Sequence, residues 1–212
     1  MLLSGDGQVI GAVATSPLSF VVLDSSGTAG VVGRPLATAI RAAAEQAREV
    51  LVAPEDAGWA AVALPEWSLE EATLFVRSDQ VALPVFTKNG ARHITREELA
   101  ASSGVPAGLR EELLVEAAVG HLVASFANGG PVAFCYPSSL TERWWDVSID
   151  TLPDHRRQGH AARAVACAIK HMAQTGRAPV WGAVASNVAS ARLARKLGFH
   201  ATDRLIVFSR AS

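Results

Sequence analysis

The residues best suited to chemistry lie where a strand pattern leads through a polar loop into a helical pattern, at residues 149–161. The first turn of such a helix has unpaired backbone N–H groups and carries the positive end of the helix dipole, which together make an anion site. Gly159 lets the backbone approach a ligand because it has no Cβ. Arg156 and Arg157 add charge and hydrogen-bond donors. This is the chemistry that a pyrophosphate needs.

Residues 156–161, Arg-Arg-Gln-Gly-His-Ala, resemble the acyl-CoA motif of the GNAT superfamily of N-acetyltransferases, Arg/Gln-x-x-Gly-x-Gly/Ala. The family's second motif, Asn-x-x-Ser/Ala followed by Lys-Leu-Gly-Phe, is similar to Asn187–Ser190 and the run at 196–199. Both motifs occur in the family's order and spacing, and the resemblance covers about residues 84–210. It implies a GNAT fold, in which a mixed twisted sheet is flanked by helices.

The resemblance also implies where acetyl-CoA binds, namely in a V-shaped opening between the fourth and fifth strands of the fold. Backbone groups of residues 149–151 would pair with the pantetheine arm, and those of 157–161 would hold the pyrophosphate. The cofactor-binding residues expected from it are Ile149, Asp150, Thr151, Arg156, Arg157, Gln158, Gly159, His160, Ala161, Asn187 and Ser190. The alternatives are a solvated helix start for the two arginines and an N-cap for Asn187, which is compatible with a cofactor role.

Acylation of an amine needs a proton acceptor, because an alkyl ammonium has a pKa near ~10 and only the neutral amine attacks. In many family members a carboxylate at the start of the fourth strand is this base, and Asp146 is the nearest match. Alternation along a strand places Asp146, Ser148 and Asp150 on one face. The alternative for Asp146 is a structural pairing with a neighbour such as Arg143.

The sequence identifies the proton donor for the departing thiolate less clearly than it identifies the base. Many family members carry a tyrosine four residues before the glycine of the second motif, where this chain has Ala194. The chain's one tyrosine, Tyr136, is on the preceding hairpin strand, and it is our candidate for the acid. Cys135, water, or no protein acid at all are the alternatives, and a lone tyrosine in a hairpin is more often a core residue.

Strand-length apolar runs alternate with helical patterns, which predicts an α/β domain with α+β layering. The local signals are a capping box at Thr95 and Glu98, a hairpin turn at 128–130, and Gly198 closing a helix. Strands are predicted over 83–87, 121–127, 131–136, 144–151, 180–185 and 200–209. Helices are predicted over 95–102, 106–119, 157–173 and 188–197.

The first 80 residues look like a degenerate copy of the second half. Val21–Asp24 is matched to Val147–Asp150, each with a glycine nine residues beyond its aspartate, and the strands at 50–52 and 74–76 are matched to 180–182 and 205–207. The alternative is that any two α/β segments share this patterning. We expect an N-terminal portion, residues 1–82, packed against a GNAT domain, residues 83–212. The N-terminal glycine loop lacks the arginine of the second half, so no second acyl-CoA is expected there.

Composition excludes several classes of function. A formal net charge of −1 and a pI of about 6.6 do not suit a nucleic-acid backbone or an anionic membrane surface. No signal peptide or membrane-spanning run is evident, and Cys135 and Cys167 are expected to be unpaired, so we expect a cytoplasmic protein. The six histidines lack metal-ligand spacing, so no metal is expected, and His155 and His160 are expected at the surface beside the phosphate loop.

The predicted function is transfer of an acetyl group from acetyl-CoA to a primary amine of a small molecule or peptide, by direct attack in a ternary complex. The predicted enzyme is an N-acetyltransferase, as a monomer or homodimer. The alternative is a non-catalytic acyl-CoA-binding or sensing module, because the usual tyrosine is absent. The tryptophans are expected in packing, with Trp144 beside the acceptor pocket. No dense acidic patch in the sequence points to a polycation as the acceptor.

Overall fold

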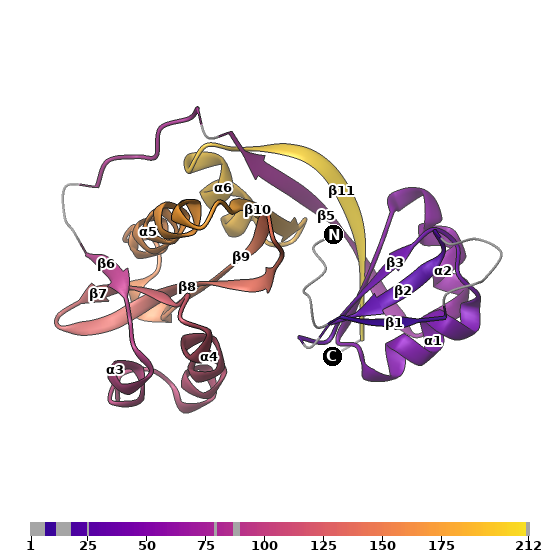
Figure 1. The fold of residues 1–212 in the computed structure, drawn as a ribbon, viewed down its shortest axis with the longest axis horizontal. Helices are drawn as coiled ribbons and strands as arrows, with labels where there is room; N and C mark the ends of the chain where they lie inside the picture. The colour runs from indigo at the N-terminus through magenta and orange to yellow at the C-terminus, as the bar shows by residue number, and fades with distance from the viewer. Residues whose placement is uncertain (1–6, 12–17, 25, 79, 87–89, 211–212) are drawn as a thin grey trace.

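The alternating strand and helix patterns produce one continuous sheet of eleven strands in the order β1-β2-β3-β4-β11-β5-β10-β9-β8-β7-β6 (Figure 1). This computed structural model describes residues 7–11, 18–24, 26–78, 80–86 and 90–210. The order is not sequential, because the last strand of the chain, β11, lies between β4 and β5. The observed mixed sheet with flanking helices confirms the predicted fold class.

The described residues of the first half form five strands and two α-helices. Its strands are β1 (Gln8–Ile10), β2 (Phe20–Leu23), β3 (Thr28–Val32), β4 (Glu49–Val52) and β5 (Trp67–Arg77). Its helices are α1 (Ala37–Gln46) and α2 (Ala57–Ala63), the latter preceded by the 3-10 turn η1 (Pro54–Asp56).

The second half holds the remaining elements. Its strands are β6 (Ala91–His93), β7 (Val123–Ala127), β8 (Gly130–Leu140), β9 (Trp144–Thr151), β10 (Ala178–Val184) and β11 (Phe199–Arg210). Its helices are α3 (Arg96–Ala100), α4 (Ala107–Val119), α5 (His160–Gln174) and α6 (Val188–Lys196), with the 3-10 turn η2 (Pro153–His155) before α5.

Local signals in the sequence predicted most of these elements. The capping box of α3 forms through Thr95 and Glu98, and the β7–β8 hairpin turns at Asn128 and Gly129, whose φ angles are 50° and 83°. The strand predicted at 83–87 is wrong over 83–86, which are irregular, and residue 87 lies outside the described residues. The apolar character of Leu83 and Phe86 reflects packing against the core under α5 instead.

The hydrogen-bonding pattern is the same on both sides of the central β5–β11 pair. β11 pairs antiparallel with β4, and β5 pairs antiparallel with β10. Next outward, β3–β4 and β9–β10 are parallel, and then β2–β3 and β8–β9 are antiparallel. Each half therefore contributes its last strand to the middle of the sheet, between the last two strands of the other half. The domain boundary at residue 82 stays a prediction.

This topology corrects part of the sequence match between the halves. The strand that leads into α1 is β3. The segment Val21–Asp24 instead consists of the last three residues of β2 and the residue after that strand. The nine residues from Asp24 to Gly33 include all of β3, whereas those from Asp150 to Gly159 are mostly loop. The matches of β4 with β10 and of β5 with β11 agree with the pairing.

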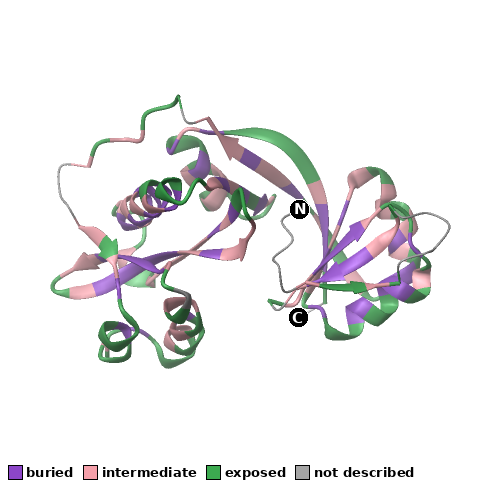
Figure 2. Ribbon diagram, in the orientation of Figure 1, coloured by how far each residue is buried: buried purple, intermediate pink, exposed green. Residues whose placement is uncertain are grey.

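The strands alternate between two environments. One set of side chains packs under the helices, in a cluster beneath α1 and α2 and another beneath α5 and α6. A third cluster lies between α3, α4 and the strands β7 and β8. Figure 2 shows these buried stretches in both halves, and the exposed stretch of β11 that arches between them. No helix in the described part of the chain is both long and apolar enough to cross a membrane.

Candidate active site

The strands β9 and β10 diverge at the position where the family resemblance implies the cofactor enters. They pair only at Trp144–Ala178, Trp145–Pro179 and Asp146–Val180. Beyond these positions β9 continues to Thr151 bonded to β8, while β10 continues to Val184 bonded to β5. The edge of β9 over residues 149–151 therefore faces the gap between the strands and has backbone groups available for a ligand.

The loop after β9 ends in a helix start with free backbone donors. Arg157 and Gly159 both have left-handed φ angles, 59° and 82°, so α5 begins at His160 and not at 157 as predicted. No side chain caps this helix, and the first N–H to bond back into the turn is that of Arg163, 3.2 Å from the carbonyl oxygen of Gly159. The N–H groups of the first turn are therefore available to an anion.

Side chains of this loop stabilise its shape. The Nε of Arg156 donates to the carbonyl oxygen of Thr151 at 3.3 Å, and the Nε2 of Gln158 donates to that of Asp154 at 2.9 Å. Arg156, Arg157 and Gln158 are exposed at the open side of the loop. The predicted cofactor residues 149–161 thus lie together along one path from the β9 edge to the start of α5.

The expectation that the His160 side chain lies at the surface is wrong. It is only 7% exposed, and its Nδ1 lies 2.9 Å from Nη2 of Arg163 and 3.0 Å from Oγ of Ser125 on β7. A guanidinium only donates, so Nδ1 is the acceptor. Burial lowers the pKa of His160, and the charge of Arg163 lowers it further. The imidazole is therefore a buried packing group, and the cofactor-binding role expected for His160 stays a prediction.

The second motif forms the start of α6. The Oδ1 of Asn187 accepts the N–H of Ser190 at 3.1 Å, which confirms the N-cap alternative, and Asn187 also lines a cavity on the concave face of the sheet. The Oγ of Ser190 accepts the indole N–H of Trp181 at 2.8 Å and so fixes α6 to β10. Ala194, where the family's tyrosine would stand, is fully buried.

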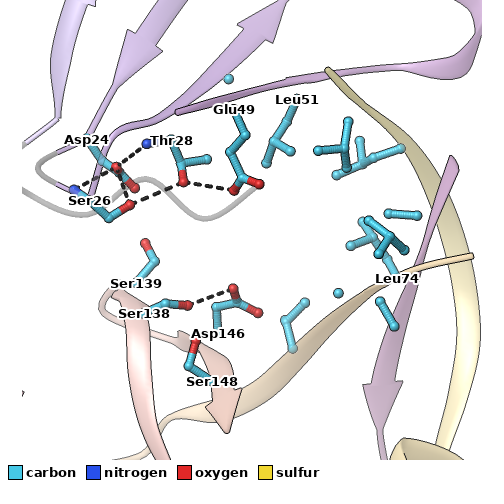
Figure 3. A pocket seen from close by; sticks show the side chains of 18 of the residues that line it. Asp24, Ser26, Thr28, Glu49, Leu51, Leu74, Ser138, Ser139, Asp146 and Ser148 are labelled. Carbon is cyan, nitrogen blue, oxygen red and sulfur yellow. Dashed lines mark hydrogen bonds between the residues drawn. The ribbon is translucent and has the colours of Figure 1, made fainter. Parts of the chain in front are cut away.

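The cavity has a volume of about 590 Å³ and is walled by both halves of the chain (Figure 3). Strands β2, β3 and β4 line one side, β8, β9 and β10 line the other, and β5 and β11 lie between them. Trp144, Asp146 and Ser148 of β9 line this cavity, and Trp144 is 40% exposed. Asp146 and Ser148 thus share a face as predicted, while Asp150, predicted on the same face, is not among the lining residues. Trp145 is fully buried on the opposite, helix-covered face.

The Asp146 carboxylate is held by a β-bulge in the neighbouring strand. The register of β8 against β9 shifts between Pro137 and Ser139, and the extra residue, Ser138, donates its hydroxyl to Oδ2 of Asp146 at 2.9 Å. Burial raises the pKa of Asp146 above its usual value, and the negative charge of Glu49 adds to this rise. Among the described residues no ion pair joins Asp146 to Arg143, and the neighbour that pairs with its side chain is Ser138 instead.

The two candidate general acids, Tyr136 and Cys135, are poorly placed to donate a proton to a departing thiolate. The hydroxyl of Tyr136 donates to Oδ2 of Asp150 at 2.9 Å, and burial, together with the charge of Asp150, raises the pKa of the phenol well above its usual value. Cys135 is fully buried in the core under α5, where burial raises the pKa of its thiol. Cys135 and Cys167 are both free, as expected.

Sequence reasoning missed several polar residues of the cavity, including Ser138, Asp24 and Glu49. The signal for Glu49 was the alternation of Glu49 and Leu51 with the apolar Val50 and Val52, which places the glutamate on the sheet face away from the helices. Ser138 had no such signal, because it depends on a bulge. Within the described residues no group of three or more His, Cys, Asp or Glu side chains could hold a metal ion.

Part of the chain matches the model of a known protein family. Residues 117–208 match the family model of GNAT acetyltransferases. No curated protein matches this sequence.

Solved structures share the fold over nearly the whole chain. A GCN5-related N-acetyltransferase-like protein from Streptococcus suis has a TM-score of 0.73 and 16% identity, over 96% of this chain and 88% of that one. A GNAT-family acetyltransferase from Colwellia psychrerythraea has a TM-score of 0.60 and 15% identity, over 94% and 83%. A tandem GNAT protein from the clavulanic acid biosynthesis pathway has a TM-score of 0.58 and 12% identity, over 98% and 84%. Residues 117–208 are therefore similar to GNAT acetyltransferases, and the chain as a whole has the GNAT fold.

Proposed function

We propose that this chain transfers an acetyl group from acetyl-CoA to a primary amine by direct attack in a ternary complex. The observation that carries the proposal is the divergence of β9 and β10. It links the anion-binding start of α5 on one side to the cavity that contains Asp146 on the other. A cofactor and an acceptor that enter from these two sides meet beside β9. Both walls of the cavity come from one chain.

The residues present fit an acyl-CoA. The N–H groups of 157–161 would bind the pyrophosphate, the β9 edge at 149–151 would pair with the pantetheine arm, and Asn187 would lie near the sulfur end. When bound, acetyl-CoA supplies an activated thioester. At Gly159 a Cβ would meet one heavy atom of the described residues outside its own turn within 4 Å, Nη1 of Arg163 at 3.3 Å, so the approach to the backbone is open.

Asp146 is the proposed general base. Its raised pKa brings a carboxylate closer to the working pH, which improves it as a proton acceptor. The Ser138 hydroxyl orients the carboxylate toward the cavity. Asp146 takes the proton that the amine loses as its nitrogen bonds to the acyl carbon and the carbon–sulfur bond breaks.

The proposal is tested with purified protein, acetyl-CoA and a panel of primary amines, by following release of the free thiol. Release that depends on the amine is the expected result. Binding of CoA with no amine-dependent release would instead establish the alternative, a non-catalytic acyl-CoA-binding module. The retained carboxylate in the cavity favours the enzyme.

We expect one CoA to bind per chain in a calorimetric titration. The connection from β3 to α1 is only residues 33–36, and Pro35 in it lacks a backbone donor. A Cβ on Gly33 would lie 2.6 Å from the carbonyl oxygen of Leu18. Other protein atoms therefore block the approach of a ligand to the backbone of this turn, whereas the approach at Gly159 is open. The cavity-facing residues of β3, Thr28 and Gly30, also provide no carboxylate. A stoichiometry of two would refute this prediction.

We expect Tyr136→Phe to lower kcat far less than the ~100-fold or more that is typical when a general acid is removed. The phenol of Tyr136 already donates to Asp150, and its raised pKa makes it a poor donor to a thiolate. Steady-state kinetics on the folded variant measure this directly. A loss of two orders of magnitude in kcat, with unchanged melting temperature, would establish Tyr136 as the acid that the sequence suggested.

A further inference from the structure

The cavity is lined by both acidic and aliphatic side chains. Its polar lining includes three carboxylates, Asp24, Glu49 and Asp146, and no lysine or arginine is among the described residues that line it. Much of the rest is aliphatic, with Leu51, Leu74, Leu205, Val207 and several smaller residues. The sequence alone shows no dense acidic patch, because these three carboxylates come together only when the two halves fold against one cavity.

The carboxylates lie on opposite walls. Figure 3 shows Glu49 extending from β4 toward the side where Asp146 and Ser138 lie. Thr28 donates its hydroxyl to Oε1 of Glu49 at 3.0 Å, and this bond fixes the glutamate while leaving its charge in place. None of the ion pairs found among the described residues involves Glu49 or Asp146.

Asp24 is fixed beside Glu49 in the same way. Its Oδ1 accepts the N–H and the hydroxyl of Ser26, at 3.0 Å and 2.6 Å, and the N–H of Thr28 at 2.9 Å. The N-terminal half thus presents two oriented negative charges to the cavity. Burial raises the pKa of Asp146, and the charge of Glu49 raises it further. Carboxylates that share a partly desolvated space are stabilised by a cation between or beside them.

Building on the proposed function, we propose that the acceptor is an aliphatic diamine or polyamine. Its distal ammonium binds Glu49, with Asp24 beside it, while its reactive amine lies at Asp146. The aliphatic lining between the polar walls suits the methylene chain of such a molecule, and a ligand site that is mostly apolar with a few convergent polar groups is the usual arrangement. In this view the N-terminal half, which lacks a cofactor site, determines which acceptor is used.

The test compares kcat/KM for 1,4-diaminobutane, butylamine and 4-amino-1-butanol in the wild-type protein and in Glu49→Gln. Glutamine keeps the acceptor oxygen for Thr28 and removes only the charge. The wild type should favour the diamine by at least about tenfold, since a hydrogen bond to a charged group contributes ~1.5–3 kcal/mol. Glu49→Gln should remove most of this preference, whereas kcat/KM for butylamine should fall much less, since butylamine loses only the effect of Glu49 on the pKa of Asp146. Glu45→Gln, an exposed residue on α1, is the matched control.

A second measurement needs no variant. N,N,N′,N′-tetramethyl-1,4-diaminobutane cannot be acylated to a stable amide, and it should compete with butylamine at least about tenfold more tightly than N,N-dimethylbutylamine. Equal inhibition by the two, or equal kcat/KM for butylamine and the diamine, would overturn the diamine proposal while leaving amine acetylation intact. Absence of thiol release with every amine would instead overturn the proposed function. An equal loss for both amines in folded Glu49→Gln would refute the assigned role of Glu49.

Discussion

Replacing Asp146 with asparagine is expected to lower kcat by roughly 100-fold or more, the usual scale for loss of a general base. The amide keeps the shape of the side chain and an oxygen that accepts the hydroxyl of Ser138, so the bulge at Ser138 is preserved. What disappears is the capacity to take a proton from the amine. The affinity for CoA should hardly change, because the pyrophosphate site at the start of α5 is at the other end of the cofactor.

The pH dependence separates this role from a structural one. Asp146 accepts a proton only when it is ionised, so wild-type kcat/KM should fall as the pH drops through its raised pKa. In Asp146→Asn that acidic limb should be absent. The deficit should also shrink at high pH, where more of the amine is already neutral. Asp203→Asn, at an exposed position on β11, is the control for a lost carboxylate.

Turnover and melting temperature are measured on the same preparation. If Asp146 only stabilises the fold, its substitution lowers the melting temperature and leaves the turnover of folded protein nearly intact. An unchanged rate in a well-folded variant would direct attention to Glu142, Asp150 or a water chain as the proton acceptor.

Features determined by a few adjacent residues could be predicted from the sequence. The capping box at Thr95, the left-handed turn at Asn128 and Gly129, and the strand at 144–151 all depend on short-range chemistry. The same holds for the order of the strands and helices in the GNAT domain, because each carries its own hydrophobic period. The position of the anion loop followed from this order together with Gly159.

Features that depend on contacts between residues far apart in the chain could not be predicted from local sequence patterns. Nothing local to residues 67–77 indicates that this strand lies between β10 and β11, and that placement is what brings Glu49 to the cavity that contains Asp146. The bulge that aims Ser138 at Asp146 depends on the register of two strands. His160 was expected at the surface because its burial depends on Ser125, which is 35 residues away in the chain.

Replacing Gly159 with valine is expected to weaken CoA binding by about 100-fold, because the loss of two or more charge-assisted hydrogen bonds to the phosphates has this scale. Gly159 has a φ angle of 82°, a conformation that a β-branched residue strongly disfavours. The variant therefore either distorts the turn or places methyl groups where the backbone donors must approach the ligand. The one atom that a Cβ would touch is the terminal Nη1 of Arg163, which can move, so the fold itself should tolerate the change.

The matched control is Gly176→Val. Gly176 follows the same helix, α5, has a φ angle of 74°, and has no atom within 4 Å of a Cβ, so it imposes similar backbone strain away from the cofactor site. Calorimetric titration with CoA and thermal unfolding are carried out on both variants. Both should lose comparable stability, but only Gly159→Val should lose CoA affinity. If folded Gly159→Val binds CoA as tightly as the wild type, the pyrophosphate does not bind at the start of α5. If both variants lose affinity equally, the effect arises from strain in α5 and the contact assigned to Gly159 is wrong.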